Sequence, residues 1–177
     1  MTRDDGKMDG PAAGSMLARL LDGPMAPGRI AWIGLRPARR EPMRVVTEVL
    51  AEPGKGLEGD RFTSNRNSGR QVTLVSQEHL HAIAGYLSRP EITPGQLRRN
   101  LVVTGLNLAA LKNRRFRIGG ALLAWSGECH PCSRMEEELG PGGYNAVRGH
   151  GGITARVLEG GMIRLGDPVE RVLDGAD

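Results

Sequence analysis

Apolar residues recur along this chain in short runs that suit β-strands better than long helices. Several runs alternate apolar and polar positions, and many contain β-branched residues. They predict strands over 28–35, 43–50, 71–75, 101–104, 115–118, 121–125, 151–158, 162–165 and 169–173. Turns at Gly119-Gly120 and at Glu159-Gly160-Gly161 predict two hairpins between the flanking strands. Many short strands with few helices between them indicate a mostly β fold, namely a closed or partly open antiparallel β-barrel with a few short helices.

Helical periodicity occurs in only a few places. The clearest helix is expected over 77–87, because its apolar positions share one face and Ser76 is placed to cap the first turn. Those apolar positions are Leu80, Ile83, Ala84 and Leu87. Shorter helical pieces are expected over 16–21, 107–111, 133–139 and 144–147.

The chain divides into one body and two ends. Glycine, proline and charged residues dominate 1–27, which we expect to be a flexible tail containing at most a short docking helix. Residues 28–173 hold all the predicted strands and make one barrel domain, and 174–177 form a short second tail. The 177 residues suffice for one domain with its own hydrophobic core.

Composition and charge narrow the choice of partners. Aromatic residues make up only 3%, which argues against a nucleic-acid surface that stacks bases. The net charge of +4 and the pI near 9.6 suit a small anionic ligand. No stretch is apolar enough to cross a membrane, and the polar N-terminus does not resemble a signal peptide. We therefore expect no membrane association and a reducing, cytoplasmic location.

Both cysteines of the chain lie in one stretch, Cys129-His130-Pro131-Cys132, between a predicted strand and a predicted helix. Because proline favours the first helical position, we expect Cys132 in the first turn of that helix. The unpaired amides of a helix start, together with Arg134 and His130, would lower the pKa of the thiol. Cys132 is therefore the candidate nucleophile or soft-metal ligand.

Two other chemistries fit the same cysteine pair. A zinc site needs four ligands, and Cys129, Cys132, His130 and the distant His150 would supply them, although no second close ligand pair is present. A thioredoxin-like redox pair also has the C-x-x-C spacing, but this chain lacks the early strand–helix context of that fold. A structural disulfide is disfavoured, because nothing marks the chain as secreted.

Four stretches, taken in order, make the body of the chain (28–173) resemble a stand-alone MOSC domain, the module at the C-terminus of molybdenum cofactor sulfurases. Each stretch alone is a weak signal, but their order and spacing are fairly specific. They are Gly56-Leu57-Glu58-Gly59-Asp60-Arg61, the segment 70–76, the segment 98–105, and Phe116-Arg117-Ile118-Gly119 leading to the two cysteines. The resemblance implies a barrel like the pyruvate kinase barrel domain.

The resemblance also implies a cofactor. In this family one cysteine binds molybdenum or carries sulfur, and the match assigns that cysteine to Cys132. The ligand is the molybdenum cofactor, molybdopterin, whose phosphate suits guanidinium groups and whose metal suits a soft thiolate. Arg98 and Asn100 resemble the Arg-x-Asn that contacts this cofactor in amidoxime-reducing relatives. The candidate cofactor-binding residues are Arg61, Arg98, Arg99, Asn100 and Arg134.

Three classes of function follow from these residues. The first is a molybdenum-dependent oxidoreductase that reduces N-hydroxylated compounds with a redox partner protein. The second is a sulfur carrier that takes a persulfide from a sulfurase and passes it to metal–sulfur centres. Family members of that kind are associated with pyridoxal phosphate, but we expect no pyridoxal-phosphate domain and no second barrel domain here. The third is a thiol-redox or zinc protein that uses Cys129 and Cys132.

A structural expectation accompanies the cofactor hypothesis. Arg98 and Asn100 lie two residues apart, so an extended backbone would point them the same way. Both should then converge with Cys132 on one cleft, although more than thirty residues separate them along the chain.

Overall fold

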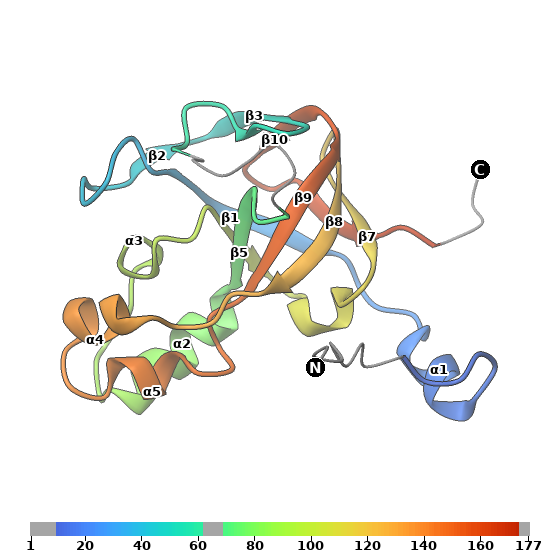
Figure 1. Ribbon diagram of the computed structural model, residues 1–177, viewed down its shortest axis with the longest axis horizontal. Coiled ribbons are helices and arrows are strands. Elements are labelled where there is room, and N and C mark those ends of the chain that lie inside the picture. The colour runs from blue at the N-terminus through green and yellow to red at the C-terminus, as the bar shows by residue number, and fades with distance from the viewer. Residues whose placement is uncertain (1–9, 62–68, 174–177) are drawn as a thin grey trace, which may run out of the picture.

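The computed structural model describes residues 10–61 and 69–173, and it places most strands in one closed barrel (Figure 1). The barrel strands run in the order β11-β7-β8-β9-β5-β6-β1, and pairing of β1 with β11 closes the ring. β2 extends the sheet beyond β1. The bounds are β1 Gly28–Leu35, β2 Arg44–Val46, β5 Val72–Ser76, β6 Leu101–Thr104, β7 Arg115–Ile118, β8 Ala121–Glu128, β9 Ile153–Glu159 and β11 Pro168–Arg171.

The predicted fold class, mostly β with a barrel and short helices, is confirmed. All barrel pairings are antiparallel except that of β5 with β6, which makes the barrel mixed. Helices α2 (Gln77–Tyr86) and α3 (Pro94–Leu97) connect these two strands. Parallel neighbours need a crossover of this length, whereas a tight turn joins only antiparallel strands.

A second, three-stranded sheet has the order β10-β3-β4, formed by Gly161–Arg164, Glu48–Glu52 and Gly56–Leu57. Two sequence predictions are corrected here. The single strand expected over 43–50 is two strands, because β2 pairs with β1 whereas β3 pairs with β10. The hairpin expected around 159–161 does not form, since β9 pairs with β5 and β8 while β10 turns away to β3.

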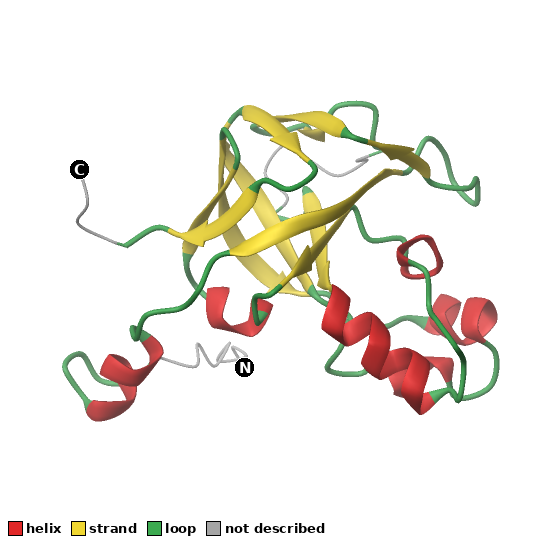
Figure 2. Cartoon of the chain, turned by 180° about the vertical axis from the view of Figure 1, so that it is seen from behind, coloured by secondary structure: helices red, strands yellow, loops and turns green. Residues whose placement is uncertain are grey.

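The hydrophobic residues form two clusters. One fills the barrel, where Phe116, Ile33 and Leu74 are wholly buried. The other lies under the helices, where the predicted face of α2 packs with α4 (Ser133–Leu139) and α5 (Gly143–Val147). Ser76 caps α2 as predicted, its hydroxyl accepting from the His79 amide at 3.1 Å. Figures 1 and 2 show these helices gathered on one side of the barrel.

The N-terminal arm lies on the other side of the molecule from α2, α4 and α5 (Figure 1). It contains α1 (Met16–Leu21), and Met25 packs against the barrel core. Residues 1–9 of the first expected tail and the whole of the second, 174–177, lie outside the described residues. A short 3₁₀ helix, η1 (Leu108–Leu111), follows β6. No helix in the described ranges is long and apolar enough to span a membrane.

Candidate functional site

The two cysteines follow β8, at the turn into α4. Cys132 is exposed and is the N-cap residue of α4, with an extended backbone and no side-chain capping bond. The prediction that Cys132 lies in the first helical turn is therefore wrong, because Pro131 precedes the helix and Ser133 begins it. Because Cys132 is exposed and makes no capping bond, its thiol is accessible from outside the protein.

The buried Arg99 side chain binds the backbone around the turn that contains Cys129 and Cys132. Arg99 is only 8% exposed, and its guanidinium donates to the carbonyl oxygens of Leu97 at 2.6 Å, Gly151 at 2.7 Å and Cys129 at 3.5 Å. Burial lowers the pKa of Arg99, whereas Cys129 and Cys132 raise it. Arg99 therefore lies near both sulfur groups, but its described donor contacts are to backbone carbonyls.

Gly152 and Arg99 together fix the position of Cys129. The Cys129 amide donates to the Gly152 carbonyl at 2.8 Å. Gly152 has φ +86°, and a Cβ there would lie 1.9 Å from the Leu74 carbonyl oxygen, so only glycine fits. Cys129 is buried at 7% exposure, in contrast to exposed Cys132.

A cleft of about 260 Å³ lies between the loop after β1, the residue after α3, and α4. Six of its seven lining residues are arginines: Arg36, Arg39, Arg40, Arg61, Arg98 and Arg134, with Ala38. Of these six arginines, only Arg36 and Arg134 have carboxylate partners among the described residues, namely Asp60 at 2.6 Å and Glu138 at 3.3 Å. The cleft therefore has a marked excess of positive charge and suits an anion.

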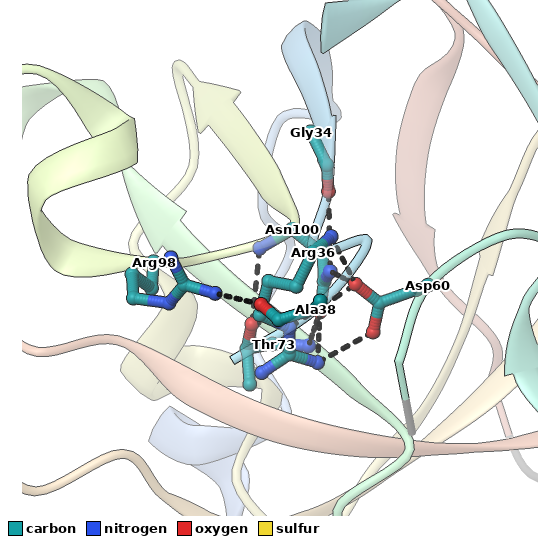
Figure 3. A network of polar contacts seen from close by, with 7 residues as sticks. All are labelled: Gly34, Arg36, Ala38, Asp60, Thr73, Arg98 and Asn100. Atoms are coloured by element: carbon teal, nitrogen blue, oxygen red, sulfur yellow. Dashed lines mark hydrogen bonds and ion pairs between the residues drawn. The ribbon is translucent and has the colours of Figure 1, made fainter. Parts of the chain in front are cut away.

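Arg36 is the most firmly oriented of these arginines (Figure 3). The wholly buried Asp60 carboxylate accepts from Nε of Arg36 at 3.1 Å, from its second guanidinium nitrogen at 2.6 Å, and from its backbone amide at 2.6 Å. Asn100 supports the pair, since its side-chain amide donates to Asp60 at 3.1 Å and its oxygen accepts from Arg36 at 3.3 Å. Thr73 and Gly34 bond the same amide group.

Arg98 lines the cleft, but its backbone is not extended. It is the C-cap of α3, in the left-handed conformation with φ 54°, so the expectation that an extended backbone aligns it with Asn100 is wrong. Its guanidinium donates to the carbonyl of Glu41 at 2.7 Å. It also donates to the carbonyl of Ala38 at 3.2 Å (Figure 3). Burial lowers the pKa of Arg98, and the positive charge of nearby Arg134 lowers it further.

Arg134 and Arg61 complete the cleft from opposite parts of the chain. Arg134 lies on the first turn of α4, two residues after Cys132, so the thiol and the cleft share one helix start. The Nε of Arg134 is buried and has no hydrogen-bond partner in the described part of the chain. The exposed Arg61 is tied to the loop after β1 by its backbone amide, which donates to the Arg36 carbonyl at 2.7 Å.

Comparison with known families identifies the chain. The family model for the MOSC domain matches residues 55–170, about two thirds of the sequence. The chain belongs to the MOSC domain family. A search of curated proteins found no match.

Solved structures share the fold of this MOSC domain. It resembles the YUAD protein from Bacillus subtilis with a TM-score of 0.72 and 22% identity, covering 82% of this chain and 96% of that one. It resembles YiiM from Escherichia coli with a TM-score of 0.64 and 22% identity, covering 87% and 73%. YiiM from Geobacillus stearothermophilus gives 0.64 and 21%, covering 85% and 77%. At these identities the likeness shows the fold alone.

The structure of the MOSC domain separates the predicted site residues into two groups. Arg61, Arg98 and Arg134 line the cleft, whereas Asn100 and Arg99 are buried and hold other groups in place. Of the three residues expected to converge on one cleft, only Arg98 lines it, because Asn100 is buried and Cys132 is exposed at the start of α4 outside the lining. Sequence reasoning missed the three arginines of the loop after β1. The segment Arg36-Pro37-Ala38-Arg39-Arg40 carried a signal, since it gathers three guanidinium groups directly after a strand.

A second, larger cavity of this MOSC domain, about 610 Å³, lies elsewhere, beside α2 and α5. Tyr86, Arg148 and His150 are among its lining residues, and neither Cys132 nor any arginine of the cleft is. It is less suited to an anion than the cleft, because only one of its lining side chains carries a permanent positive charge. Within residues 10–61 and 69–173, no three His, Cys, Asp or Glu side chains cluster as a metal site.

Proposed function

We propose that this MOSC domain binds the molybdenum cofactor, with the arginine cleft holding the phosphate-bearing end and Cys132 serving as the molybdenum ligand. The proposal rests on one observation: the thiol and the arginine cleft meet at the start of the same helix. Cys132 is the N-cap residue of α4, and Arg134 of α4 lines the cleft. A phosphate pairs well with several guanidinium groups, and a thiolate is a suitable ligand for a soft metal.

The residues of the cleft fit the phosphate of this cofactor in charge and in unused donors. Arg39, Arg40 and Arg61 make no described side-chain hydrogen bond, and Nε of Arg134 is a buried donor without a partner. Buried donors are nearly always satisfied in proteins, and a bound anion would satisfy this one. When bound, the cofactor would supply the redox-active metal, while this chain orients its phosphate and presents the Cys132 thiol.

A sulfur-carrier function of Cys132 is the second candidate, and its exposure favours it. A persulfide needs an accessible thiol but no cluster of arginines, so the cleft favours cofactor binding over sulfur transfer alone. The thiol-redox alternative requires both sulfurs to react, and Cys129 is buried. A zinc site would need further ligands beside the cysteines, and the described residues offer no such group.

The test is a titration of the apo-protein with free molybdenum cofactor, followed by absorbance and by the molybdenum content of the separated protein. We expect Arg98→Ala to weaken binding by roughly ten- to a hundredfold, because a charge-assisted contact contributes about 1.5–3 kcal/mol. Arg98→Lys should restore only part, since lysine lacks the planar guanidinium fork. Arg39→Ala should also weaken binding without disturbing the fold, because its side chain makes no described hydrogen bond.

Arg117→Ala is the matched control, because Arg117 is an exposed arginine on β7 that pairs with Glu159 outside the cleft. It should bind the cofactor as the wild type does. Cys132→Ser should retain the pterin more weakly and lose molybdenum on separation. Wild-type affinity in both Arg98→Ala and Arg39→Ala would refute the shared site, and wild-type molybdenum retention in Cys132→Ser would refute the assigned ligand.

A further inference from the structure

Two histidine side chains from distant parts of the chain contact each other where α2 and α5 lie next to one another (Figure 1). His79 lies in the first turn of α2, and its backbone amide donates to the capping hydroxyl of Ser76 at 3.1 Å. His150 follows α5, and its amide donates to the Val147 carbonyl at 2.9 Å. The two ring centres are 4.8 Å apart, and the ring planes are at 87°. Helix capping and a turn therefore hold both imidazoles in place.

The Nδ1 atoms of both rings are buried and have no hydrogen-bond partner. Among the partly or fully buried residues that the structure describes, three side-chain nitrogen or oxygen atoms are in this state, and two of them are Nδ1 of His79 and Nδ1 of His150. The third, Nε of Arg134, belongs to the arginine cleft. Buried polar atoms without a partner are rare in proteins. Two of them in one ring contact indicate a ligand that both imidazoles bind.

The protonation of the pair favours a metal ion over an anion. Burial lowers the pKa of His79, and the charge of His150 lowers it further, so the His79 ring is neutral at neutral pH. The Glu78 carboxylate acts in the opposite direction, but its described bonds are to the Gly105 amide and the Thr104 hydroxyl. A neutral imidazole offers a lone pair to a metal, whereas binding an anion by charge would require a protonated ring.

The distance between the rings suits two imidazole ligands on one ion. A zinc–nitrogen bond of about 2.1 Å puts each ring centre about 3.2 Å from the ion, so ligands at octahedral to tetrahedral angles have ring centres about 4.5–5.2 Å apart. The 4.8 Å separation of His79 and His150 lies within this range. His150 also lines the open cavity of about 610 Å³, which has room for water ligands.

We propose that His79 and His150 together bind one divalent transition-metal ion, with water from the cavity completing its coordination. Imidazole suits zinc, copper and nickel, whereas magnesium and calcium prefer oxygen ligands. No third His, Cys, Asp or Glu joins the pair within residues 10–61 and 69–173, so the ion is exchangeable. The proposal is independent of the molybdenum site, because neither Cys132 nor any arginine of the cleft lines this cavity.

The test is a calorimetric titration of the metal-free full chain with Zn²⁺, in a Cys132→Ser background that removes the exposed thiol. We expect one ion per chain and no binding of Mg²⁺ at this site. His79→Asn and His150→Asn should each weaken zinc binding at least about tenfold, because losing a ligand costs no less than losing a group that only orients one. Zinc should also raise the melting temperature of the parent protein, since the ion links α2 to the segment after α5.

The other two of the four histidines provide matched controls. His81 is exposed on α2 beside Gln77, and His130 is exposed between the two cysteines. His81→Asn and His130→Asn should bind zinc as the parent protein does.

A second measurement does not depend on the folding of a variant. The paramagnetic resonance spectrum of Cu²⁺ bound to the parent protein should show coupling to two imidazole nitrogens. A parent protein that binds no zinc would overturn the proposal, as would a copper spectrum without two coupled nitrogens. Zinc affinity that is unchanged in His79→Asn and His150→Asn, or that falls equally in all four variants, would also overturn it.

Discussion

Replacing Asp60 tests the network that orients Arg36. The Asp60 side chain is wholly buried and accepts four hydrogen bonds, three from Arg36 and one from Asn100. Asp60→Ala removes the acceptor of all four bonds, and the Arg36 backbone amide and Nε then have no other described acceptor. Breaking a buried ion pair costs about 3–5 kcal/mol, and we expect a loss near the lower end, about 3 kcal/mol, because Arg36 is 22% exposed and water can reach it.

The loss is measured as the free energy of unfolding in urea, where the midpoint should fall while the slope stays constant. Glu48→Ala is the matched control, because Glu48 pairs with Arg164 at 2.9 Å but both side chains are more than half exposed. An exposed pair contributes about 0–1 kcal/mol. A loss for Asp60→Ala no larger than that for Glu48→Ala would refute the assignment of a buried, organising carboxylate.

Anion binding gives a second measurement, which tests whether Asp60 positions Arg36 or acts only through its negative charge. If Asp60 acted only as a nearby negative charge, Asp60→Asn would strengthen binding of pyrophosphate to the cleft. Because the carboxylate aligns the Arg36 guanidinium, we expect Asp60→Asn to weaken pyrophosphate binding instead. The affinity should fall roughly tenfold, which corresponds to a loss of about 1.4 kcal/mol of binding free energy. Tighter binding in Asp60→Asn would contradict the positioning role.

Two further predictions concern groups outside this network. Burial lowers the pKa of His79 below 6.5, and the charge of His150, whose ring lies 4.8 Å away, lowers it further. The folded protein therefore binds fewer protons than the unfolded chain. Its free energy of unfolding should fall as the pH drops below 6.5. Urea unfolding from pH 7.5 to 5 should show this pH dependence of stability. The dependence should be smaller in His79→Asn but unchanged in the control His81→Asn, and an equal dependence in all three proteins would contradict the prediction. In the native protein, a thiol reagent should modify the exposed Cys132 at least about tenfold faster than the buried Cys129. Mass spectrometry of the labelled peptides measures both rates, and faster labelling of Cys129 would contradict Cys132 as the reactive thiol.

Local patterns in the sequence determined most of the elements of this MOSC domain. The hairpin of β7 and β8 follows from two alternating strands joined at Gly119-Gly120, and its pairing of Ile118 with Ala121 is local. The start of α2 follows from Ser76 and from the apolar face behind it. In each case the interacting residues are close in the chain, so periodicity and capping residues carry enough information.

Strand partners were decided by the tertiary structure. The sequence of β9, Gly160 and β10 reads as a hairpin, but β10 instead pairs with β3, more than a hundred residues earlier. A Cβ on Gly161 would lie 2.3 Å from the Gly120 carbonyl, so this turn passes directly against another one. Which distant edge is free to accept a strand depends on the closed barrel, and no local pattern encodes it.

The candidate site shows the same division. The sequence by itself determined the residue types: a thiol after a strand, arginines in several loops, and the order of stretches that marks the family. Only the tertiary structure decided that three loops and α4 bring six guanidinium groups to one cleft, and that Asn100 supports the Arg36–Asp60 pair without lining that cleft. Arg98 adopts a left-handed backbone because it ends α3, a conformation set by the packing of that short helix rather than by its place before a strand.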